Sequence, residues 1–115
     1  MTNPLRGTIK VTLADKEYNA RLTIDSIVQI EQAVGMGIIK LANKMSEGDI
    51  SVSDTLNVLH PALRGGGNDL QMKDVTKIVQ NAGIVSATTA VANILTKALV
   101  TEEADDTEKK PVEAE

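Results

Sequence analysis

Hydrophobic and polar residues alternate along the first part of the chain. In residues 8–13, TIKVTL, every second residue is apolar, and the alternation returns over residues 18–22 after a polar turn around Asp15 and Lys16. A period of two is typical of strands with one side facing solvent, so this segment predicts a β-hairpin. Because a lone hairpin is only marginally stable, its apolar face is expected to pack on another element.

From Thr23 onward the apolar residues take the three-and-four spacing of helices. Thr23 is expected to cap the first helix, and Gly35 and Gly83 to end the first and the fourth. Pro61 lies inside the third segment, and its missing N–H predicts a kink or break near residues 57–60. The pattern predicts five helical segments, over about residues 24–34, 38–45, 52–63, 72–82 and 84–98.

The starts of the third and fourth helices carry different capping signals. Ser51 and Asp54 resemble a weak capping box at the start of the third helix. Gln71 stands where the fourth helix begins and is a poor cap, so Asp69 is an alternative.

The composition favours an aliphatic, helical core. Tyr18 is the only aromatic residue among 115 residues, whereas a sheet-rich fold normally contains more aromatic side chains. The absence of cysteine excludes disulfides, thiolate zinc sites and cysteine nucleophiles. The expected fold is α+β, with an N-terminal hairpin packed on four to five helices.

The net charge of −4 is concentrated at the C-terminal end. Residues 101–115 contain seven acidic residues and two lysines, which leaves residues 1–100 at +1. We therefore predict one domain over residues 1–100 and a disordered acidic tail over residues 101–115. The nearly neutral domain has no basic stripe, which argues against nucleic-acid binding, and no apolar run indicates a membrane segment, so a cytoplasmic location is the default.

The sequence LRGGGNDLQMKDV, residues 63–75, raises the question of a phosphate-binding loop. A phosphate loop of the Walker type requires Lys followed by Ser or Thr directly after the last glycine, and a strand before the loop. Here Asn68 and Asp69 follow the glycines, and the preceding segment is helical. The spacing of a dinucleotide fingerprint is also absent. The favoured interpretation is that the glycines end one helix and turn the chain into the next.

His60 and Glu31 are two further candidates for a metal-binding or catalytic role. His60 is the only histidine and has no partner for a usual metal site, so it is expected at the surface or at a helix end. Glu31 lies among apolar residues, where an exposed position or an ion pair with Arg21 or Lys44 is favoured over a buried functional carboxylate. The sequence therefore predicts no catalytic, cofactor-binding or metal-binding residues, and indicates a protein that acts by contact.

The order and spacing of several short motifs resemble a known family. They are KEYNARLTI at 16–24, IEQAVG at 30–35, ISVSDTLNVLHPALRGGG at 50–67 and the helix–glycine–helix segment at 72–99. Together they resemble the small tail proteins of gene transfer agents and related siphophage-type prophages, whose most specific motif is Leu-Arg-Gly-Gly. Members of that family are described both as tail tube proteins and as tail assembly chaperones.

The resemblance implies a role in building a phage-like tail. Tail tubes generally consist of stacked rings of β-sandwich subunits, so a chain with one hairpin fits a chaperone better. A chaperone would bind the tape measure protein and the major tail protein. An aliphatic groove between helices that contains Met36, Met45 and Met72 would suit this role, but ordinary core packing is the favoured interpretation of each methionine. Homo-oligomerisation is a further option. The candidate contacts, with a structural turn as the favoured explanation, are Arg64, Gly65, Gly66 and Gly67.

Two alternatives to the chaperone role stay open. The first is a structural subunit of the tail, such as a tube or adaptor protein, which would be located in the virion. The second is a small regulatory module that binds a basic partner through the acidic tail.

Overall fold

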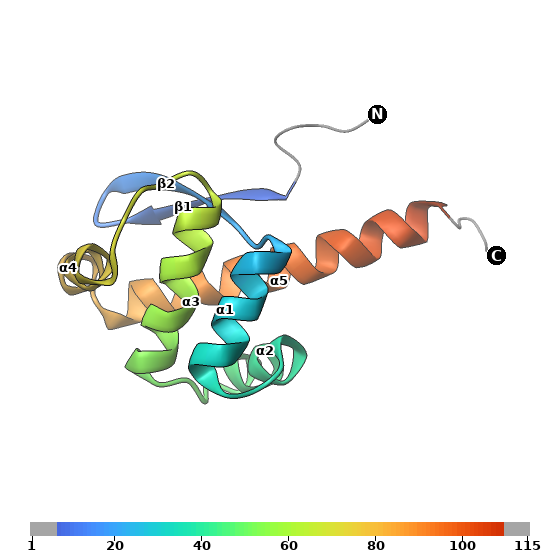
Figure 1. Cartoon of the computed structure of the whole chain (residues 1–115), viewed down its shortest axis with the longest axis horizontal. Helices are drawn as coiled ribbons and strands as arrows, with labels where there is room; N and C mark the ends of the chain where they lie inside the picture. Colours follow the sequence, from blue (N-terminus) through green and yellow to red (C-terminus); the bar gives the residue numbers. More distant parts are fainter. Residues whose placement is uncertain (1–6, 110–115) are drawn as a thin grey trace.

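The structure is a computed structural model that describes residues 7–109, with side chains described for residues 7–99. A two-stranded antiparallel hairpin precedes five helices, as expected for the α+β fold (Figure 1). The elements are β1 Thr8–Leu13, β2 Lys16–Arg21, α1 Ile24–Val34, α2 Ile38–Ser46, α3 Val52–Gly65, α4 Met72–Ala82 and α5 Ile84–Lys109.

A two-residue turn sets the register of the hairpin. Leu13 pairs with Lys16, so the turn consists of Ala14 and Asp15, with φ angles of 54° and 66°. Two left-handed residues in a two-residue loop match a type I′ turn, which suits the twist of paired strands. The alternation predicted from the sequence is confirmed, because the apolar face is buried at Ile9, Val11, Leu13 and Ala20.

The hairpin lies across α3 and α5, which form the centre of the molecule (Figure 1). β2 contacts α3, β1 contacts α5, and α3 and α5 contact each other; α1 packs beside α3, and α2 and α4 pack against α5. The core is aliphatic, as the composition predicts. Its largest fully buried apolar side chains are Leu13, Ile30, Leu41, Val58, Leu59, Leu63, Val75, Val91, Ile94 and Leu95.

The observed helix ends confirm most of the predicted caps. Thr23 Oγ1 accepts a hydrogen bond from Ser26 N at 3.0 Å, and Gly35 ends α1 with φ 78°. At the start of α4 the cap is Gln71, and its N–H donates to Asp74 Oδ2 at 2.9 Å. Asp69 is therefore not the cap, because the carboxylate in the first turn already satisfies this helix start.

Pro61 does not break α3, which runs without interruption from Val52 to Gly65. Pro61 is buried, and its carbonyl oxygen accepts a hydrogen bond from Ser26 Oγ of α1 at 3.2 Å. Leu59 and Leu63 on either side are fully buried. Packing on both sides of the proline thus outweighs the one helical hydrogen bond that it removes.

The backbone of α5 is helical beyond the core, to Lys109. It therefore includes residues 101–109, for which the composition predicts disorder; adding a residue to an existing helix is far easier than starting one. Residues 110–115 of the predicted tail lie outside the described residues. No single described helix is long and apolar enough to cross a membrane, and α4 with residues 84–99 of α5 reaches that length and composition only as a pair bent by 117°.

Candidate functional site

The glycine turn packs directly on the backbone of β2. Gly65 is the last residue of α3, and Gly66 caps the helix with φ −84° and ψ 3°. A Cβ atom at position 66 would lie 2.1 Å from the carbonyl oxygen of Asn19, and one at position 65 would lie 2.3 Å from that of Arg21. Since real Cβ atoms do not approach other atoms this closely, glycine at both positions is what allows α3 to reach the hairpin.

Asn68 fixes this turn against the hairpin. Its Nδ2 donates hydrogen bonds to the carbonyl oxygen of Asn19 at 2.7 Å and to that of Leu63 at 3.0 Å. Its backbone N–H also donates to the Leu63 carbonyl at 3.0 Å. The sequence interpretation considered Asn68 only as a departure from a phosphate loop and missed this role, because the distance of 49 residues to Asn19 leaves no local signal.

The four candidate contact residues divide into two pairs. Gly65 and Gly66 are partly buried against β2, whereas Arg64 and Gly67 are exposed. Gly67 has φ +100°, and a Cβ atom there would meet nothing within 4 Å. A partner could therefore reach Arg64 and Gly67, while the two glycines before Gly67 have a packing role.

His60 and Glu31 each form a hydrogen bond that links two segments of the fold. His60 Nε2 lies 3.0 Å from the carbonyl oxygen of Leu70, and so links α3 to the segment before α4. Glu31 Oε2 accepts a hydrogen bond from the backbone N–H of Ile38 at 2.9 Å, which caps α2 from the end of α1. The sequence favoured an exposed position or an ion pair for Glu31 over a buried functional carboxylate, and did not predict this cap.

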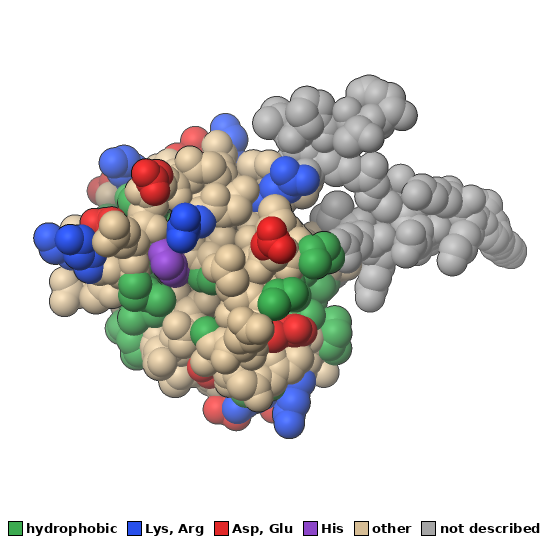
Figure 2. Space-filling model, in the orientation of Figure 1, with side chains coloured by type: hydrophobic (Ala, Val, Ile, Leu, Met, Phe, Trp, Pro, Cys, Tyr) green, Lys and Arg blue, Asp and Glu red, His purple; other side chains and the backbone are tan. Residues whose placement is uncertain are grey.

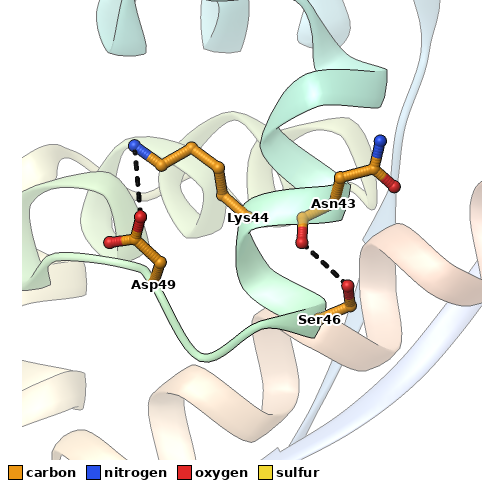
Figure 3. Close-up of polar contacts among 4 residues, drawn as sticks. All are labelled: Asn43, Lys44, Ser46 and Asp49. Atoms are coloured by element: carbon orange, nitrogen blue, oxygen red, sulfur yellow. Dashed lines mark hydrogen bonds and ion pairs between the residues drawn. The ribbon is translucent and has the colours of Figure 1, made fainter.

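Lys44, one of the two cations proposed for Glu31, has a different partner. Its Nζ lies 3.8 Å from Asp49 Oδ2, beyond the end of α2 (Figure 3). Ser46 Oγ donates to the carbonyl oxygen of Asn43 at 2.7 Å in the same turn. Among the residues whose side chains the structure describes, no three His, Cys, Asp or Glu side chains gather closely enough to hold a metal ion.

A groove of about 400 Å³ lies between β1 and the first half of α5. The sequence interpretation did not identify it, since the strand and the helix that form it are more than 70 residues apart. Val85, at one end of the groove, is 80% exposed. The lining residues are Lys10, Val11, Thr12, Val85, Ser86, Thr89, Ala90 and Asn93.

Large hydrophobic side chains are also exposed on the helices. On α1, Ile24 is 74% exposed and Val28 is 43% exposed. Of the three methionines, Met45 is buried in the core and Met36 is partly buried against it, as the favoured interpretation of core packing predicts, whereas Met72 is 36% exposed. Figure 2 shows hydrophobic side chains both beside the histidine and on the opposite side of the same face.

Residues 6–101 match the model of a family described as "phage tail tube protein, GTA-gp10". The match covers both strands and the helices up to the end of the described side chains. No curated protein and no solved structure matches the chain.

Proposed function

The chain belongs to the family of the phage tail tube protein, GTA-gp10, and from this premise we propose that it is a non-enzymatic tail assembly chaperone. The observation that supports this choice is the small amount of sheet. The described residues contain two strands of six residues each, paired only with each other. A tube built of β-sandwich rings requires many strands with long pairing edges, whereas this chain is mainly a small helical domain.

The proposed partner surface is the exposed apolar stripe of α1, formed by Ile24 and Val28. The two side chains are four residues apart, so they lie one above the other on the same helix face. An exposed pair of β-branched side chains suits the apolar stripe of another helix. The long helices of a tape measure protein expose such stripes before a tube encloses them, and the major tail protein would be the second partner.

A structural role in the tail is the second candidate function. It is favoured by the family description, which names a tube protein. A chaperone acts in the cytoplasm during assembly and is absent from the finished particle, whereas a structural subunit stays in the virion. The two functions therefore differ in where the protein is found after assembly.

The test is co-expression of the full chain with the tape measure and major tail proteins encoded beside it. We expect this chain to keep the tape measure protein soluble, as measured by pull-down and light scattering, and to be absent from purified tails by mass spectrometry. The double variant Ile24→Lys with Val28→Lys should lose this effect. The matched control, Gln29→Lys with Gln32→Lys, changes exposed polar residues of the same helix and should retain it.

Retention of the chain in purified tails, at a fixed ratio to the major tail protein, would contradict the chaperone proposal and support the structural role. Equal activity of the two double variants would contradict the assignment of the α1 stripe as the partner surface.

A further inference from the structure

The two outer edges of the hairpin differ in how they are covered. In a hairpin with a two-residue turn, the two residues that flank the turn form a hydrogen-bonded pair. Hydrogen-bonded and non-hydrogen-bonded pairs then alternate along the strands. From the pair Leu13–Lys16, the backbone N–H and C=O groups of Lys10 and Thr12 point away from β2, and those of Glu17 and Asn19 point away from β1. Asn68 of the glycine turn covers the Asn19 edge.

The outer edge of β1 faces the groove. Lys10 and Thr12 belong to the exposed face of the strand and Val11 to its buried face, and all three line the groove, whereas no residue of β2 does. The groove therefore runs along the strand edge and not over one face. Among the backbone–backbone hydrogen bonds of the described residues, none outside the hairpin involves Lys10 or Thr12. An uncovered strand edge is a template for pairing with another chain.

The residues that line the groove suit an extended segment. A strand added to β1 would lie about 4.8 Å from it. α5 lines the same groove with Ser86, Thr89 and Asn93, whose hydroxyl and amide groups can form hydrogen bonds with a bound segment. An extended segment can pair with the strand edge and also reach these polar side chains, so its chemistry suits the groove.

We propose that the groove between β1 and α5 binds an extended segment of a partner protein, which adds a third strand to the hairpin. Among the described residues that line the groove, only Lys10 carries a charge, and its Nζ lies 3.9 Å from Glu17 Oε1 of β2, so the segment is expected to bind mainly through its backbone. Val85 offers an apolar contact at one end of the groove. This inference rests on the proposed function for the source of the segment, which is another protein of the tail.

The test uses the full chain and a set of overlapping peptides of 12 residues from the tail proteins encoded beside it. We expect at least one peptide to bind and to slow amide hydrogen exchange at Lys10 and Thr12 about tenfold or more. Thr12→Pro removes an outward N–H and should weaken this binding by about tenfold or more. Glu17→Pro, the matched control, removes the outward N–H of the residue paired with Thr12 on the other strand, and should bind like the wild type.

The proposal would be overturned if no peptide binds, if a bound peptide leaves amide exchange at Lys10 and Thr12 unchanged, or if the two proline variants weaken binding equally. Protection of both amides by self-association of the chain would overturn it in favour of a second copy as the occupant. Peptide binding at β1 without any effect on the solubility of the tape measure protein would support this inference and reject the proposed function, so the two fail independently.

Discussion

A single added carbon atom at position 66 has no space, because it would lie 2.1 Å from the carbonyl oxygen of Asn19. The φ and ψ angles of Gly66 are accessible to alanine, so the predicted effect comes from overpacking alone. We expect Gly66→Ala to lower the free energy of unfolding by about 2–3 kcal/mol, measured by urea denaturation followed by circular dichroism. Gly37→Ala is the control, since its Cβ would make an ordinary contact at 3.8 Å. Equal stability of the two variants would contradict the packing role of the glycine turn.

The turn of the hairpin contains a residue in an unfavourable conformation. Ala14 has φ 54°, a left-handed angle that asparagine tolerates better than alanine. We therefore expect Ala14→Asn to raise the free energy of unfolding by about 0.5–1 kcal/mol in the same denaturation experiment. The same substitution at Ala33, on the exposed side of α1, should lower the free energy of unfolding, because asparagine is a poorer helix former than alanine. Destabilisation at position 14 as well would show that the turn is not of type I′.

At the scale of elements, Glu31 connects two helices that are close in sequence. Its carboxylate accepts the N–H of Ile38 at the start of α2, where Gly37 as N-cap has no side chain to do so. We expect Glu31→Ala to lower the free energy of unfolding by about 1 kcal/mol, and Glu31→Gln, which keeps an acceptor oxygen, to lower it by less. Amide hydrogen exchange at Ile38 is the local measurement. An unchanged rate of amide hydrogen exchange at Ile38 in Glu31→Ala would contradict this capping role.

The elements themselves could be predicted from the sequence where the signal is local. The alternation of residues 8–13 and the caps at Thr23 and Gly35 depend on neighbours within a few residues, and the structure has them as expected. Pro61 did not follow the local rule, because its environment is supplied by Ser26 of another helix. A sequence pattern contains the preference of a segment but not the packing that overrides it.

At the scale of the whole molecule, the family could be identified from motif order, but the surfaces could not. The resemblance predicted a tail protein, and the family match confirms it over residues 6–101. The groove beside β1 is formed by β1 and α5, and the edge of β2 is covered by Asn68. Both features bring together segments that are distant in sequence, so no local pattern predicts them. Whether Arg64 and Gly67 contact a partner stays a prediction.

The charge of the chain is uneven, because its acidic residues are concentrated after residue 100. Residues 101–115 have no apolar periodicity and a high density of charge, so they are not expected to contribute to the core. We expect a chain that ends at residue 100 to keep its melting temperature within about 2 °C, measured by circular dichroism, while its net charge changes from −4 to +1. If the protein acts through its helical surface, this shorter chain should still keep the tape measure protein soluble. Loss of partner binding on truncation, together with a strong weakening of full-length binding by salt, would instead identify the acidic segment as the binding element and favour a regulatory module.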